Sequence, residues 1–134
     1  SYRPISIPCV TDKILQKLVN KQLVDHLERY SLISPRQYGF RPKSNTQTVL
    51  FDVVSEIQKH CDTKKNVAAV FLDLSKAFDT CDRKILMKRL SEMGVRGRSM
   101  QWFQGFFNNR SQFVQDNSVS SSNQNVEYGV PQGS

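Results

Sequence analysis

The sequence predicts an α+β fold, and three observations support this. Apolar residues recur at three- and four-residue steps in several stretches, which is the spacing of one face of an α-helix. One short stretch, 67–74, is apolar at nearly every position, as in a strand buried on both faces. The 134 residues are 38% hydrophobic and 23% charged, which suits a globular chain better than a disordered one. No apolar run approaches the roughly 20 residues of a membrane-spanning helix, so we expect no membrane partner.

Two helices are expected before the strand. The first follows residue 12 and has a repeating apolar face, formed by Ile14, Leu15, Leu18, Val19, Leu23 and Leu27. Residues 32–43 contain two prolines and a glycine and are expected to be irregular. Residues 44–47 match a capping box, in which Ser44 would cap the second helix. The apolar face of that helix is expected to consist of Val49, Leu50, Val53, Val54, Ile57 and Cys61.

Two further helices and a strand pair are expected after the strand. A helix is predicted from about Asp82 to Met93, ended by Gly94. The next helix carries Met100 and an aromatic cluster whose helical spacing favours a buried face over a base-stacking platform, formed by Trp102, Phe103, Phe106 and Phe107. Residues 112–115 and 126–130 are expected to pair as strands across a Ser- and Asn-rich stretch.

The charge is distributed unevenly along the chain. The net charge is +7, with eight basic and three acidic residues in 1–48 and seven basic and three acidic residues in 83–134. The segment between them carries four basic and six acidic residues. Basic flanks attract polyanions such as nucleic acid, although solvated surface charge explains the composition equally well. Three cysteines without a CxxC pair favour a reducing, intracellular compartment over a disulfide framework or a zinc site.

Asp73 is the strongest candidate for a metal-binding or catalytic residue. It lies near the end of the predicted strand, where a carboxylate is costly to bury unless it is paired, hydrogen-bonded or bound to metal. Such a carboxylate is well placed to hold Mg²⁺, and the Leu74 carbonyl offers a second oxygen. A structural Asp that caps the following turn explains an isolated Asp73 at least as well. A phosphatase of the Asp-x-Asp type is disfavoured because Ser75 occupies the second position.

Four blocks of the sequence resemble those of a known enzyme family. Residues 71–79, Phe-Leu-Asp-Leu-Ser-Lys-Ala-Phe-Asp, resemble motif A of reverse transcriptases in the form typical of non-LTR, LINE-type retrotransposons. Residues 2–6 and 37–46 resemble two motifs of the fingers, and residues 129–134 resemble the start of motif B. The blocks occur in the order found in that family and extend across essentially the whole chain.

The resemblance implies a right-hand polymerase, of which this chain is an incomplete domain. Residues up to about 66 would belong to the fingers and residues 67–134 to part of the palm, cut within motif B. The implied activity is RNA-directed DNA synthesis from deoxynucleoside triphosphates on an RNA template, starting from a DNA primer. The implied cofactor is a pair of Mg²⁺ ions, with Mn²⁺ as an alternative. The parent element would act in the nucleus or the cytoplasm.

The resemblance also implies roles for individual residues. Asp73 would be the first catalytic carboxylate and a metal ligand together with the Leu74 backbone carbonyl. Phe78 would lie under the sugar of the incoming nucleotide, although a core position explains it too, and Gln132 would lie against that nucleotide. Three basic residues of the fingers would reach the triphosphate, namely Arg3, Lys13 and Arg41.

The local sequence bears on the basic residues and on two glycines. An ordinary surface position explains Arg3 and Lys13 equally well. No acidic residue occurs between Glu28 and Asp52, so Arg41 is expected to lack a local ion-pair partner and to contact the triphosphate or the template. Gly129 and Gly133 would leave backbone open to a substrate, although ordinary turn glycines would look the same.

The family's second catalytic element, an aromatic-x-Asp-Asp turn, does not occur in the 134 residues. We therefore expect this fragment to be inactive by itself. Two rival hypotheses remain: an enzyme of the group II intron or retron type, and a nucleic-acid-binding relic without a catalytic role.

Overall fold

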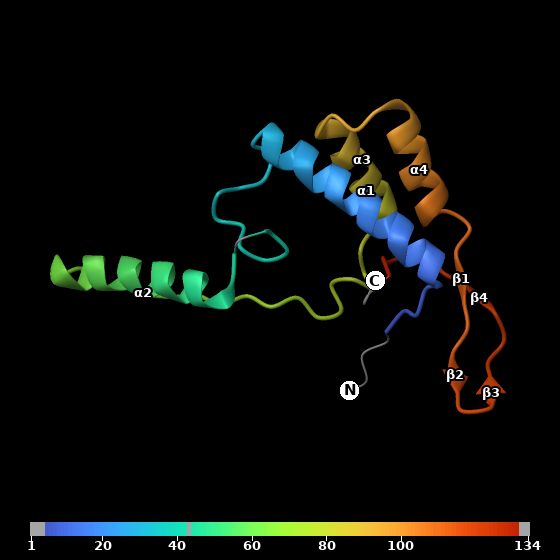
Figure 1. Cartoon of the computed structure of the whole chain (residues 1–134). Coiled ribbons are helices and arrows are strands. Elements are labelled where there is room, and N and C mark those ends of the chain that lie inside the picture. The colour runs from blue at the N-terminus through green and yellow to red at the C-terminus, as the bar shows by residue number, and fades with distance from the viewer. Residues whose placement is uncertain (1–4, 43, 132–134) are drawn as a thin grey trace. The chain divides into compact units, whose positions relative to one another are not determined.

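The computed structural model describes residues 5–42 and 44–131, which form two compact units. One unit consists of residues 26–73, and the other combines the residues up to 25 with those from 74 onward. This division differs from the fingers and palm boundary near residue 66, which stays a prediction. Helices and two small antiparallel sheets confirm the mixed α and β content (Figure 1).

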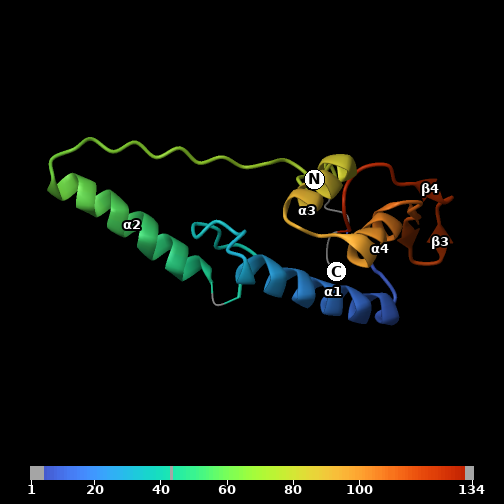
Figure 2. The same cartoon turned by 90° about the horizontal axis from the view of Figure 1, so that it is seen from above.

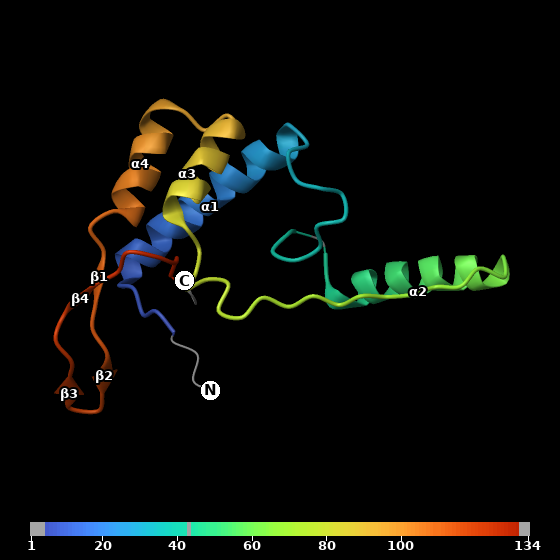
Figure 3. The same ribbon diagram turned by 180° about the vertical axis from the view of Figure 1, so that it is seen from behind.

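Three helices enclose the small core of the unit that contains both chain ends. They are α1 (Val10–Arg29), α3 (Arg83–Glu92) and α4 (Gly97–Phe107). Figures 1 and 3 show α1 lying beside α3 and α4 in views from opposite sides. Partly buried Val19 and Leu23 of α1 pack against a buried cluster formed by Leu90, Val95, Phe103 and Phe107. Only part of the apolar face predicted for the first helix attaches α1 to this core, because Ile14, Leu15 and Leu18 stay exposed.

Local hydrogen bonds explain where α3 begins and ends. The Asp82 carboxylate caps the first turn by accepting a hydrogen bond of 2.7 Å from the backbone N–H of Lys84. Gly94 adopts a φ of 88°, and the Val95 N–H donates to the Leu90 carbonyl at 3.0 Å. This is the 6→1 bond of a Schellman motif, and its two residues are also buried together in the core. The helix predicted from about residue 82 to 93 is confirmed.

The aromatic cluster of α4 forms a packed face, as predicted. Phe103 and Phe107 are only 9% and 7% exposed. Trp102 and Phe106 stack with 5.1 Å between their ring centroids and 10° between their planes, and both pack against the buried cluster. Because these rings are used in the core, α4 does not offer them as a platform for bases.

The strand pairing predicted after α4 is confirmed only in part. β1 (Ser111–Gln112) pairs antiparallel with β4 (Gln124–Asn125), and β2 (Gln115–Asp116) pairs with β3 (Val119–Ser120) (Figure 1; β3 and β4 are also labelled in Figure 2). The partner of β1 therefore lies within the Ser- and Asn-rich stretch, rather than at 126–130. The reason is a tight turn between β2 and β3, in which Asn117 takes the left-handed φ of 50° that such turns need.

The other unit contains α2 (Thr46–Asp62), which has no buried residue. Its N-cap is Asn45 and not the predicted Ser44, because the Asn45 side chain accepts a hydrogen bond of 2.9 Å from the Thr48 N–H. The apolar face of α2 is exposed, with Leu50 at 64%. In the two described ranges, no helix has the length and apolarity needed to cross a membrane.

The strand predicted at 67–74 is not formed. The segment is extended but unpaired, and its apolar side chains are exposed, including Val70 at 82%, Phe71 at 87%, Leu72 at 91% and Leu74 at 78%. A strand buried on both faces needs neighbouring strands to satisfy its backbone groups and layers above and below to cover its side chains. No strand among the described residues runs beside this segment.

Candidate functional site

A tight turn follows the segment that holds Asp73. The backbone N–H groups of Asp79 and Thr80 both donate to the Lys76 carbonyl, at 2.9 and 3.0 Å, and the Thr80 hydroxyl donates to it at 3.1 Å. Lys76 itself has a left-handed φ of 54°. The turn carries Phe78, whose side chain is 38% exposed. Phe78 is thus held on a hydrogen-bonded turn a few residues after Asp73.

The segment 129–130 docks directly against this turn. The Val130 N–H donates to the Phe78 carbonyl at 2.8 Å, and the Gly129 N–H donates to the Cys81 carbonyl at 2.8 Å. These two bonds form what we call the 78–130 junction. The junction joins the end of the block that resembles motif A to the start of the block that resembles motif B. Two of the four blocks therefore meet in the structure, although they are far apart in the sequence.

Gly129 is required by the chain's own backbone. It is buried, with a φ of 80°, and a Cβ placed on it would lie 2.8 Å from the carbonyl oxygens of both Phe78 and Asp79. L-residues with a side chain rarely adopt this φ, and no carbon atom fits at that distance from two oxygens. The close approach expected at Gly129 is thus made by the turn at Phe78 and Asp79.

Arg83 donates hydrogen bonds to four backbone carbonyls, a role that was not predicted from the sequence. Its Nε donates to the Gly129 carbonyl at 2.7 Å, and its terminal nitrogens donate to the carbonyls of Phe107 and Val126 at 2.7 Å and of Tyr128 at 3.1 Å. Burial lowers the pKa of the guanidinium, and the nearby charge of Arg110 lowers it further. Arg83 therefore links α3, the end of α4 and the segment 126–129 through one side chain.

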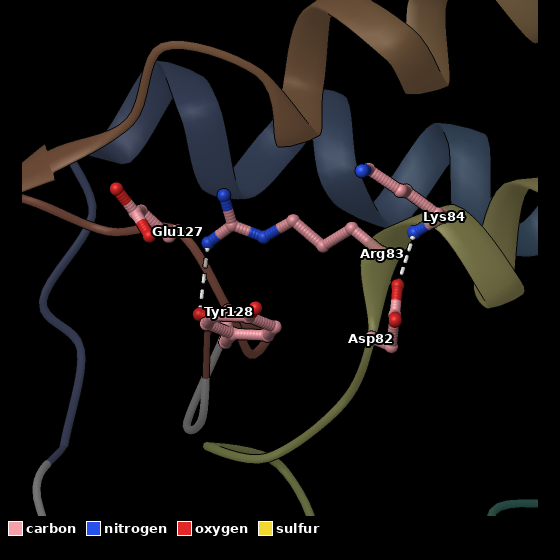
Figure 4. Close-up of a pocket in the computed structure, with 5 residues that line it drawn as sticks. All are labelled: Asp82, Arg83, Lys84, Glu127 and Tyr128. Atoms are coloured by element: carbon pink, nitrogen blue, oxygen red, sulfur yellow. Dashed lines mark hydrogen bonds between the residues drawn. The ribbon is translucent and has the colours of Figure 1, made fainter.

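An open pocket lies beside Arg83 (Figure 4). Its walls are Asp82, Arg83, Lys84, Glu127 and Tyr128. The Asp82 carboxylate already caps α3, and the close-up shows Arg83 extending toward Tyr128, to which it is hydrogen-bonded. Two of the polar side chains that line the pocket are therefore already used by the chain's own backbone.

Asp73 and Leu74 lie where the two compact units adjoin in the sequence, and both are exposed. In the ranges that the structure describes, no three His, Cys, Asp or Glu side chains come together as a metal site. One carboxylate and one carbonyl are oxygen donors of the kind that Mg²⁺ takes, but they fill only two of its six octahedral positions, and water, substrate phosphates or further residues would have to fill the others. The metal-binding roles of Asp73 and Leu74 stay predictions.

Arg41 has an ion-pair partner, contrary to the prediction. Its Nε and one terminal nitrogen donate to the two Glu28 carboxylate oxygens at 2.7 and 2.8 Å, and the other terminal nitrogen donates to the Ser34 carbonyl at 3.1 Å. Glu28 lies in the last turn of α1, and the following loop turns Arg41 back toward it. The pairing was not predicted because Glu28 lies 13 residues before Arg41, on the preceding helix. The contact of Arg41 with a triphosphate or template stays a prediction.

The ion pair has a pH dependence that can be measured. The hydrogen bond from Arg41 lowers the pKa of Glu28 below its ordinary value of 4.5. The pair therefore contributes to stability above about pH 4.5, and this contribution is lost as the pH falls through the lowered pKa of Glu28. In carboxyl-resolved NMR titrations, we expect Arg41→Ala to raise the pKa of Glu28 towards 4.5. An unchanged pKa in that variant would contradict the pairing.

A second contact fastens the same loop to α2. The Tyr38 hydroxyl donates to the Asp52 carboxylate, which raises the pKa of Tyr38. The loop 32–42 is thus held to the end of α1 through Arg41 and to α2 through Tyr38. Neither contact was predicted, because acidic partners on two different helices leave no pattern in the local sequence.

The remaining predicted residues lie elsewhere in the chain. Lys13 lies in the first turns of α1 with an exposed side chain. Arg3, Gln132 and Gly133 lie outside the described residues. Their predicted roles in nucleotide binding or close approach stay predictions.

Comparison with known proteins identifies the family. Residues 1–134 match the family model described as reverse transcriptase (RNA-dependent DNA polymerase). The chain is 30% identical over its whole length to a probable RNA-directed DNA polymerase from transposon X-element of Drosophila melanogaster, covering 15% of that protein. It is 29% identical to the RNA-directed DNA polymerase from mobile element jockey of Drosophila funebris, covering 14% of it. No solved structure matches significantly. The resemblance drawn from the four blocks is confirmed, and the chain belongs to the reverse transcriptase (RNA-dependent DNA polymerase) family.

Proposed function

We propose that the chain forms part of the polymerase domain of a non-LTR, LINE-type retrotransposon protein. The match of residues 1–134 to the reverse transcriptase family supports this most, and the 78–130 junction agrees with it because it brings two of the family blocks together. The names of the relatives, which refer to a transposon and a mobile element, favour this origin over an enzyme of the group II intron or retron type. The reaction would be template-directed DNA synthesis on RNA, inside the cell, in the nucleus or the cytoplasm.

Individual residues would have separate roles in a right-hand polymerase site. Asp73 would supply one carboxylate to a divalent-metal site, with the Leu74 carbonyl beside it. Phe78 would lie under the sugar of the incoming deoxynucleotide, and Gln132 would lie against the same nucleotide. The basic residues Arg3, Lys13 and Arg41 would offset the charge of the triphosphate.

The chain spans about 15% of the length of the curated relatives it matches. The site proposed here holds one carboxylate, and an Asp-Asp pair is missing from the 134 residues. Two metal ions held by so few ligands are not stabilised against their own repulsion and dehydration. We therefore expect the 134-residue chain to bind substrates without extending a primer, and the complete protein to carry the activity.

Primer extension by the complete protein tests the proposal. With an RNA template, a DNA primer and deoxynucleoside triphosphates, Asp73→Asn is expected to lower kcat on the order of 10³-fold, because the carboxylate that would hold the divalent metal is lost. Asp62→Asn is the matched control, since Asp62 is an exposed carboxylate at the end of α2. Activity that survives Asp73→Asn to the same degree as Asp62→Asn would refute the assigned role.

The non-catalytic alternative is supported by the net charge of +7. A relic that binds nucleic acid would retain salt-sensitive RNA affinity, independent of metal and unaffected by Asp73→Asn, while showing no synthesis. RNA binding measured at two salt concentrations alongside the extension assay separates the two functions.

A further inference from the structure

The Arg41 guanidinium is only partly used by its contacts. A guanidinium carries five N–H groups. Glu28 accepts one from Nε and one from a terminal nitrogen, and the Ser34 carbonyl accepts one from the other terminal nitrogen. Two N–H groups, one on each terminal nitrogen, are left for another acceptor. A fork of this kind matches two oxygens of a phosphate group.

The backbones of both residues that hold the guanidinium are fixed by hydrogen bonds. The Glu28 carbonyl accepts a hydrogen bond from the Ser31 N–H at 3.1 Å where α1 ends, so the backbone of Glu28 belongs to a closed helix terminus. The Ser34 carbonyl also accepts from the Gln37 N–H at 2.9 Å within the loop. The side chains of Arg41 and Glu28 are 24% and 36% exposed, so the pair is partly shielded yet open to a ligand. The plane of the Arg41 guanidinium is thus held by its ion pair with Glu28 and not by Arg41 alone.

We infer that Glu28 is a positioning residue, which holds Arg41 so that its two remaining N–H groups face the triphosphate of an incoming nucleotide. The inference deepens the proposed function and rests on it. Glu28 touches no substrate in this account and acts only through Arg41. An opposite role is also testable, in which the Glu28 carboxylate competes with phosphate for the guanidinium.

The test compares two substitutions with the same change in charge. Glu28→Gln removes the carboxylate that holds Arg41. Glu92→Gln removes the carboxylate of the exposed Arg89–Glu92 pair, which has a similar length of 2.8 Å. Both variants add one positive charge, so any general attraction of polyphosphate rises equally in the two. Only Glu28→Gln disturbs Arg41.

In the complete protein, Glu28→Gln is expected to raise the KM for dTTP about five- to tenfold on an oligo(dT)-primed poly(rA) template, with kcat little changed. Glu92→Gln is expected to leave the KM as it is. Because Glu28 acts through Arg41, Glu28→Gln is expected to add nothing in an Arg41→Ala background. A KM equal to that of Glu92→Gln, a lowered KM, or an additive effect in the double variant would each overturn the inference.

Equilibrium binding of dTTP to the same proteins separates this inference from the proposed function. If no synthesis occurs but Glu28→Gln weakens dTTP binding relative to Glu92→Gln, the proposed polymerase function fails while the positioning role stands. If synthesis occurs and dTTP binding by the two variants is equal, the positioning role fails while the polymerase function stands.

Discussion

Replacing Gly129 by alanine is expected to destabilise the 78–130 junction by about 2–4 kcal/mol. The added Cβ would lie 2.8 Å from two carbonyl oxygens, and the φ of 80° would be strained for any residue with a side chain. Neither problem is relieved by moving a flexible side chain, because the atoms in the way are backbone. The turn at Phe78 and the segment 129–130 would have to separate, and both backbone hydrogen bonds of the junction would be lost.

Urea unfolding followed by the fluorescence of Trp102, the single tryptophan of the chain, measures this effect. Gly105→Ala is the matched control, because a Cβ at Gly105 in α4 meets no atom within 4 Å. In a helix interior, that substitution is expected to stabilise by about 0.5–1 kcal/mol. If Gly129→Ala is as stable as Gly105→Ala, the tight approach at the junction is not present in solution.

Loss of the Arg83 guanidinium is expected to cost about 2–4 kcal/mol of stability. Arg83→Met removes the donor to four carbonyls but keeps much of the apolar stem. Arg83→Lys retains the charge, yet a single ammonium has three N–H donors in place of a planar fork and cannot serve the same four acceptors. We therefore expect the lysine variant to recover only a minor part of the loss.

Lys84→Met controls for the change in charge at Arg83. Lys84 is the next residue, its side chain is exposed, and removing it lowers the net charge by the same amount. We expect its stability to stay within about 0.5 kcal/mol of the unmodified chain. The same urea titrations decide the matter, and an Arg83→Lys variant as stable as the unmodified chain would show that charge, and not the fork, is what matters.

The helices could be predicted because their signals are local. Asp82 and Gly94 mark the ends of α3 by capping it and by allowing a left-handed backbone, and both signals lie within a few residues of the helix itself. The aromatic spacing in α4 likewise predicts its buried face. The cap of α2 was misplaced by one residue, since Ser44 and Asn45 are both good N-cap residues. The first helix begins at Val10 and not after residue 12 as predicted.

The strand that was predicted at 67–74 shows what a local sequence pattern cannot predict. An apolar run predicts burial, but burial needs other strands and layers, and none of the described residues provides them. The predicted pairing of residues 112–115 with 126–130 was wrong for a related reason. Asn117 forms a turn inside the Ser- and Asn-rich stretch, which was predicted only to connect the two strands.

The candidate site was predictable only where a family block marks it. The blocks identified Asp73, Phe78 and the segment that begins at Gly129, and the structure joins the latter two. The partners of Arg41 and Arg83 were missed because a carboxylate on the preceding helix and four backbone carbonyls leave no sequence signal. Long-range hydrogen bonds to backbone depend on the fold and not on residue type.

The 78–130 junction also has a consequence for how such chains change in length. The junction joins the two ends of the segment between residues 81 and 129. This segment is therefore a closed loop of chain, and the β2–β3 hairpin is its outermost part. Extra residues at that exposed tip add little entropic cost to closure and leave the tied ends in register. We expect insertions to be tolerated at 117–118 and to be disruptive at 78–81 or 129–130.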